Sequence, residues 1–188
     1  MYLVPRGIAL AVVVVLGYQR PIPIAHVGSG HAELRQQGRL TVLEIRNPDR
    51  PMQRVALTHP SDYRQGTNAP YEARLVAESP GRFLVFTDTF ESNPGNVQAM
   101  CGASDTGERF VHVVALGRLS HETLSVLVES CLLSIDPPPT SPEWRPKRDS
   151  AGDVGSLVLH FGDEAQPDLT YYVEADGAVS RPRTEANP

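Results

Sequence analysis

The chain has 188 residues, of which 40% are hydrophobic, and its 22 acidic and 17 basic side chains give a formal net charge of −5 at pH 7. An acidic chain without a basic stripe interleaved with aromatic residues is repelled by phosphate backbones, which excludes nucleic acid as a partner. The length fits one ordinary domain.

An unbroken apolar run at residues 8–16 follows Arg6 at the start of the chain. A positive charge, a short apolar core and then small residues are typical of a secretory signal, and a membrane span needs ~20 apolar residues. Small residues allow cleavage after Ala25 or after Ala32, and the pattern does not decide between them. We therefore expect residues 1–32 to be a signal peptide and leader, and the mature protein to be periplasmic or secreted with no stable membrane span. The alternative is a buried strand or helix of the domain itself.

Extended patterns separated by turn residues predict two hairpins in the first half of the chain. Residues 39–46 and 52–58 flank an Asn-Pro-Asp-Arg-Pro turn. Residues 71–78 and 82–90 flank Ser-Pro-Gly, where Pro followed by Gly suits the centre of a type II turn. Along residues 82–90 one side is apolar except for Asp88.

Residues 109–116 are almost continuously apolar, which predicts a central strand covered on both faces. Residues 120–135 are ambiguous. Their apolar positions fall at helical spacing, which favours a helix over about 121–134, but they also alternate, which favours a strand paired with 109–116. We keep both alternatives.

The last third of the chain continues the β pattern. Residues 156–161 and 169–174 are predicted to be strands, and Asp176-Gly177 predicts a type I′ hairpin turn. The proline-rich residues 137–146 predict an extended strap on the surface. The whole pattern indicates a mainly β, single-domain antiparallel sheet or sandwich over residues 33–180, α+β if the helix forms, with a flexible tail at 181–188.

Two cysteines, Cys101 and Cys131, are most economically explained in an exported chain as one disulfide bond. The alternative of a catalytic cysteine assisted by a histidine is disfavoured, because oxidising compartments consume free thiols. Two cysteines without a tight Cys/His spacing do not indicate a zinc cage. We predict no metal site and no cofactor.

The polar residues 91–108 form a connection of about 18 residues between two predicted strands, and connections of this length in a compact domain are often functional. A disulfide at Cys101 would brace this loop and lower the cost of ordering it on binding. The candidate partner-binding residues of the loop are its acidic and amide side chains. These are Glu91, Asn93, Asn96, Asp105 and Glu108.

Matches to catalytic motifs are weak. Asp105-Thr106-Gly107 has the triplet of aspartic proteases but lacks the preceding apolar strand and a second copy. His121-Glu122 begins like a zinc-binding His-Glu-x-x-His motif, but Ser125 occupies the place of the second histidine.

Two histidines on predicted strands, His112 and His160, are able to converge with Asp88 or Glu174, although a histidine satisfied in the core is the simpler interpretation. No phosphate-binding glycine loop occurs, so nucleotide enzymes are unsupported.

The sequence thus predicts an exported, non-enzymatic binding protein, an inhibitor or immunity-type protein that occludes a protein partner with the loop at residues 91–108. The acidic charge suits a basic partner. One alternative is a small secreted hydrolase that uses Asp88, Asp105, His112 and His160. The other is a structural protein of the cell envelope.

Overall fold

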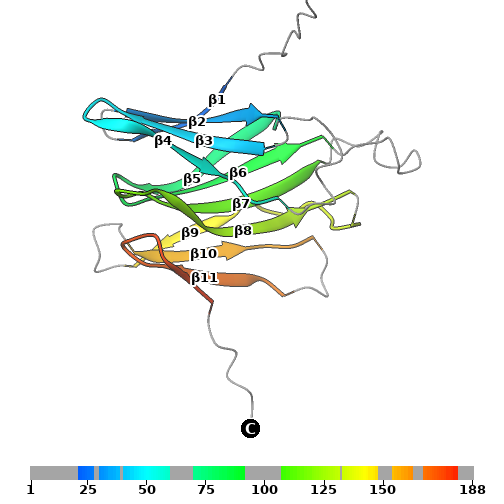
Figure 1. Cartoon of the computed structure of the whole chain (residues 1–188). Coiled ribbons are helices and arrows are strands. Elements are labelled where there is room, and N and C mark those ends of the chain that lie inside the picture. Colours follow the sequence, from blue (N-terminus) through cyan, green and yellow to red (C-terminus); the bar gives the residue numbers. More distant parts are fainter. Residues whose placement is uncertain are drawn as a thin grey trace, which may run out of the picture.

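The computed structural model is built from β-strands throughout the part of the chain that it describes. The described residues are 21–27, 30–38, 40–59, 70–91, 107–131, 133–147, 154–162 and 167–181. They form three antiparallel sheets of four strands each, which lie as three layers (Figure 1). The prediction of a mainly β, antiparallel fold is confirmed. Within these ranges there is no helix with the length and apolar character of a membrane span.

Each sheet is a continuous stretch of the chain, as expected when hairpins follow one another. The N-terminal sheet contains β1 (Ile22–Val27), β2 (Gly30–Gln37), β3 (Leu40–Asn47) and β4 (Arg50–Ala56). The central sheet contains β5 (Glu72–Ser79), β6 (Phe83–Phe90), β7 (Glu108–Ala115) and β8 (His121–Glu129). The C-terminal sheet contains β9 (Glu143–Pro146), β10 (Gly155–Leu159), β11 (Leu169–Val173) and β12 (Val179–Ser180).

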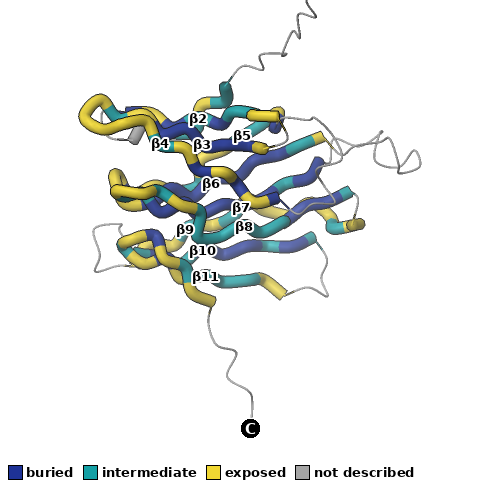
Figure 2. Tube along the Cα trace, viewed as in Figure 1, coloured by how far each residue is buried: buried dark blue, intermediate teal, exposed yellow. Residues whose placement is uncertain are grey.

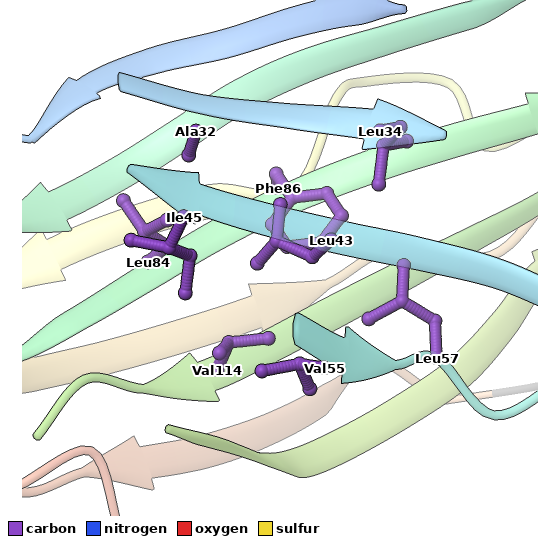
Figure 3. Packing of buried hydrophobic residues seen from close by; sticks show 9 residues of the cluster. All are labelled: Ala32, Leu34, Leu43, Ile45, Val55, Leu57, Leu84, Phe86 and Val114. Carbon is purple, nitrogen blue, oxygen red and sulfur yellow. The ribbon is translucent and has the colours of Figure 1, made fainter. Parts of the chain in front are cut away.

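The central sheet is buried on both faces, because alternate residues of its strands enter two different apolar cores. Leu84 and Phe86 of β6 pack toward the N-terminal sheet, whereas Phe83 and Val85 pack toward the C-terminal sheet. We call these two cores the N-terminal interface and the C-terminal interface. Figure 2 shows the burial of β6 and β7, and Figure 3 shows the side chains of the N-terminal interface. The predicted central, doubly covered position of residues 109–116 is confirmed by β7.

Both predicted hairpins in the first half are present. Strands β3 and β4 pair across the turn that contains Pro48, and the Asn47 side chain accepts a hydrogen bond from the Asp49 backbone. Strands β5 and β6 pair across Pro80 and Gly81, and the Arg82 backbone N–H donates to the Ser79 carbonyl at 2.9 Å. Gly81 has a φ of 73°, as a type II turn requires at its third position.

The C-terminal hairpin is present, but its turn is not the predicted type I′. That turn needs positive φ at two successive residues, and only Gly177, at 82°, has it here. The Gly177 N–H donates to the Glu174 carbonyl, and the Glu174 N–H donates to the Ala178 carbonyl. This pattern is a three-residue loop that ends in a glycine bulge.

Within the ambiguous segment at residues 120–135, His121–Glu129 form a strand, β8, and the helical alternative is wrong. Strand β8 pairs with β7 along its whole length, with register shifts that accommodate extra residues on β8. The pairing places Leu124, Val126 and Val128 in the C-terminal interface. Alternation therefore prevails over helical spacing, because a strand at this place completes the central sheet.

The proline-rich segment contributes a strand rather than only a strap. Strand β9 pairs with β10, and Trp144 of β9 lies 5.5 Å from Phe83, ring centre to ring centre. The only tryptophan of the chain thus belongs to the C-terminal interface.

The proposed cleavage positions lie inside the N-terminal sheet. Ala25 belongs to β1, and Ala32 is a fully buried residue of β2. Ile22 and Ile24 of β1 pack against the N-terminal interface. The apolar run at residues 8–16 lies outside the described residues, so the signal peptide stays a prediction, but cleavage after Ala32 would remove an entire strand of this fold.

Candidate functional site

Three polar side chains from separate parts of the chain meet in the N-terminal interface. His112 lies on β7, Asp88 on the adjacent β6, and His59 three residues after the end of β4. The Nε2 atom of His112 lies 3.0 Å from one carboxylate oxygen of Asp88, and the Nε2 atom of His59 lies 3.0 Å from the other. Asp88 therefore bridges two histidines.

A second carboxylate orients His112 from its other side. The Nδ1 atom of His112 lies 2.7 Å from Oε1 of Glu122 on β8, and Oε2 of Glu122 accepts a hydrogen bond from the Thr58 backbone N–H at 2.9 Å. The Ser125 hydroxyl also donates to the Thr58 carbonyl, at 2.6 Å. Strand β8 thus fixes the backbone immediately before His59. We call His59, Asp88, His112 and Glu122 the histidine cluster.

The histidine cluster is enclosed by protein. Asp88 and His112 are 0% exposed and His59 is 8% exposed. The ring of Phe86 stacks on His112 at 5.2 Å, and the rings of Phe90 and Phe110 pack edge-on against His59 at 4.8 and 4.7 Å. These apolar rings exclude water, so the charges within the cluster are only weakly screened.

The electrostatics favour an ionised pair. Burial by itself would raise the pKa of Asp88, but the charge and hydrogen bonds of His112 and then of His59 lower that pKa to about 2. Burial would also lower the pKa of His112, but Asp88 and then Glu122 outweigh it and raise that pKa to about 9. Asp88 is therefore a carboxylate and His112 an imidazolium at neutral pH when no other cation is bound.

This arrangement does not suit direct proton transfer to a substrate. Both ring nitrogens of His112 are engaged with carboxylates, and the residue has no exposed surface. A general base must reach the proton that it abstracts. The histidine cluster can hold charge, and it can hold a cation that replaces the protons of its histidines.

Comparison of the chain with protein-family models, with curated proteins and with solved structures finds no match. The site is therefore interpreted from its own geometry.

The predicted partner-binding residues are only partly described. Glu91 is exposed directly after β6. Glu108 is buried, with 2% exposure, as the first residue of β7, and so it does not face a partner as the loop hypothesis expected. Asn93, Asn96 and Asp105 lie outside the described residues.

The predicted disulfide also stays a prediction, because Cys101 lies outside the described residues. Cys131, the predicted partner of Cys101, follows β8 in a turn closed by the pairing of Ser130 with Ile135. Glu129 at the end of β8 pairs with Arg109 of β7. Cys131 is therefore at the end of the central sheet from which the segment containing Cys101 departs.

The histidines proposed for a hydrolase do not all converge. Asp88 and His112 meet, as that hypothesis requires. His160 instead follows β10 in the C-terminal sheet, where its Nδ1 lies 2.8 Å from Asp168. Glu174 lies in the turn after β11.

Neither His59 nor the role of Glu122 was predicted from the sequence. Asp88 was visible as the one polar residue on an apolar strand face, and His112 as a polar residue in a buried strand. His59 follows a predicted strand without any motif, and only the packing of the N-terminal sheet on the central sheet brings it to Asp88. The sequence therefore contained a recognisable pattern for Asp88 and His112 but none for His59 or for the role of Glu122.

Proposed function

We propose that the protein is an exported, non-enzymatic binding protein that contacts a partner protein at one end of its central sheet. We call this the loop end, defined by Tyr71, Phe90, Glu108 and Glu129. The observation that carries the proposal is the way in which two long connections of the chain are anchored there.

The first connection covers residues 60–69. It begins after His59, whose ring packs on Phe90, and it ends before Tyr71, whose backbone N–H donates to the Thr89 carbonyl at 2.9 Å. Both of its ends are therefore attached to the final residues of β6.

The second connection covers residues 92–106. It begins after Glu91 and ends before Gly107, whose backbone N–H donates to the buried Glu129 side chain. Phe90 pairs with Glu108, so the two ends of this connection are adjacent. Connections held on a rigid scaffold are where proteins most often place binding residues.

The scaffold under the loop end is rigid, because β6 and β7 are buried on both faces and the histidine cluster ties them to the residues before the first connection. Anchoring of this kind lowers the entropy cost of binding. The buried state of Asp88 and His112 favours binding over hydrolysis at this end of the molecule.

The charge of the chain suits a basic partner, and electrostatic attraction would raise the rate of association. The contacting residues that we propose are Glu91, Asn93, Asn96 and Asp105; Glu108 is excluded by its burial. The role is that of an inhibitor or immunity-type protein that occludes its partner.

The test is affinity capture from envelope extract with the wild type and two variants in which acidic residues are replaced by lysine, one at the loop end and one as a control elsewhere. Glu91→Lys combined with Asp105→Lys changes the loop end, and Glu78→Lys makes the same type of change at the exposed far end of β5. We expect one protein to be captured by the wild type and by Glu78→Lys, to be lost with the loop-end variant, and to bind more weakly as salt is raised. Binding should then be measured with the purified partner.

Equal capture by all three proteins would contradict a binding site at the loop end. Failure to capture any protein at low salt would contradict the binding function itself.

A further inference from the structure

The histidine cluster offers two imidazole nitrogens and a carboxylate to a common point. The candidate donor atoms of His59, Asp88 and His112 all lie within 4.8 Å of one another. In a tetrahedral zinc site with bonds of about 2.0–2.1 Å, neighbouring donor atoms lie about 3.4 Å apart. The two nitrogen-to-oxygen distances of 3.0 Å are already close to that value. Donor separations extend up to 4.8 Å, so the rings must approach by up to about 1.4 Å to complete the geometry.

From this geometry we infer that His59, Asp88 and His112 bind a divalent transition-metal ion of the zinc type. The two histidines bind through Nε2 and Asp88 through its carboxylate. Three protein donors leave one tetrahedral position for water or another small ligand. The inference is independent of the partner proposed for the loop end.

The outer contacts of the cluster are those of a metal site. A histidine that binds metal through one nitrogen almost always donates its other N–H to a carboxylate or carbonyl, which fixes the ring. His112 has this arrangement, because its Nδ1 is 2.7 Å from Glu122. Glu122 is in turn held by the backbone of Thr58, next to His59. One outer carboxylate thus positions both histidine ligands.

The charge of the cluster also suits a divalent ion. Asp88 and Glu122 supply two negative charges, and a bound divalent ion with two neutral histidines gives a net charge of zero. Two imidazole donors favour zinc, nickel or copper over calcium or magnesium, which prefer oxygen ligands. The rings of Phe86, Phe90 and Phe110 surround the site with apolar surface. The burial of all three ligands indicates a structural ion that stabilises the loop end.

The test uses the full folded protein after treatment with a chelator and removal of the chelator. Zn²⁺ should bind with a stoichiometry of one in calorimetric titration and should raise the melting temperature by several degrees. Mg²⁺ at the same concentration should do neither. Co²⁺ should give the visible absorption of a four-coordinate site, and X-ray absorption of the zinc form should show two imidazole ligands.

His59→Gln removes one ligand at the edge of the site and is expected to weaken Zn²⁺ binding at least a hundredfold. His160→Gln is the matched control, because His160 is also paired with an aspartate but lies in the C-terminal sheet. It should bind Zn²⁺ as the wild type does. If His59→Gln does not fold, Glu122→Gln serves instead and should weaken binding by about ten- to a hundredfold.

Two results would overturn the inference. One is the absence of saturable Zn²⁺ binding by the wild type at micromolar concentrations. The other is equal Zn²⁺ binding by the wild type and by a folded His59→Gln or Glu122→Gln variant, which would assign the ion to surface histidines such as His31 or His121.

Discussion

The two interfaces of the central sheet are made by the same strands but differ in chemistry. At the C-terminal interface Phe83, Val85, Val111 and Val113 are 0% exposed, and the buried polar residues that continue this face of β6, Thr87 and Thr89, are uncharged. At the N-terminal interface the apolar cluster continues into Asp88, His112 and His59. A buried ion pair is weak evidence for stability, because apolar residues of the same volume often serve as well or better. Both interfaces therefore provide apolar packing, and the N-terminal interface also gathers two histidines and a carboxylate into a candidate site.

The largest expected effect concerns the edge of the N-terminal interface. A chain that begins with Glu33 lacks β1 and the start of β2, whereas a chain that begins at Pro21 keeps the sheet complete. We expect the shorter chain to lose about 4 kcal/mol or more, because the fully buried Ala32 and the half-buried Ile22 and Ile24 leave the core and β2 loses its backbone pairing with β1. Urea unfolding of both chains measures this.

The same placement predicts the N-terminus of the mature protein. If the leader is removed in the cell, the cut should lie before Ile22, and intact mass of the exported protein would show it. A mature protein that begins after Ala32 and is as stable as the longer chain would contradict the assignment of β1 to the fold.

At the C-terminal interface, Phe83→Ala should lower the free energy of unfolding by about 4 kcal/mol. The ring is 0% exposed and packs on Trp144, and large-to-small changes of buried phenylalanine cost about 3–5 kcal/mol. Denaturant unfolding with tryptophan fluorescence follows the loss directly. A change below about 1 kcal/mol would mean that the C-terminal sheet is not packed on the central sheet as described.

At the N-terminal interface, Asp88→Asn measured in the presence of a chelator should lower the free energy of unfolding by about 3 kcal/mol. The substitution keeps the shape of the side chain but removes the carboxylate shared by both histidines, so that His112 keeps Glu122 alone among the carboxylates of the cluster. Breaking a buried charge pair costs about 3–5 kcal/mol. Asp168→Asn is the matched control, since its contact with His160 is exposed and exposed pairs contribute about 0–1 kcal/mol. Equal effects of the two variants would remove the distinction between the buried cluster and a surface pair.

The smallest expected effect lies on the outer face of the N-terminal sheet. Glu44 is buried there beneath Arg35, Arg46 and Arg54, which contact its carboxylate at 2.9–3.1 Å. Burial opposes ionisation, but the hydrogen bonds of Arg54 and Arg46 and the charge of Arg35 outweigh it and lower the pKa of Glu44 below its ordinary value of 4.5. Glu44→Gln should cost about 1–2 kcal/mol at pH 7, because the arginines lose a charged acceptor.

The sign of the pH dependence follows from that lowered pKa. The contribution of Glu44 is present above about pH 4.5 and is lost as the pH falls through its folded-state pKa, so wild type and Glu44→Gln should converge in stability toward acid. Unfolding curves at neutral and acidic pH test this. A difference that persists unchanged into acid would contradict an ionic role for Glu44.

Much of the fold could be predicted from local signals, because hairpins are made by neighbouring residues. The Pro80-Gly81 pair predicted a turn, and the alternation of apolar and polar residues along β6 predicted a strand. Even the ambiguous residues 120–135 contained the alternating apolar positions that form β8. The three-layer arrangement could not be predicted, since no local pattern says which face of β6 meets which sheet. For the same reason Asp88 and His112 were noticed separately, whereas His59 joins them only through packing between sheets.

Because β6 and β7 supply side chains to both cores, neither outer sheet can detach without exposing a face of the central one. We therefore expect a single cooperative unfolding transition rather than stepwise loss of layers. Amide hydrogens of β6 and β7 should exchange with solvent only when the whole molecule opens, and those of the edge strands β1 and β12 should exchange earlier. An ion at the histidine cluster would then slow exchange across all three layers.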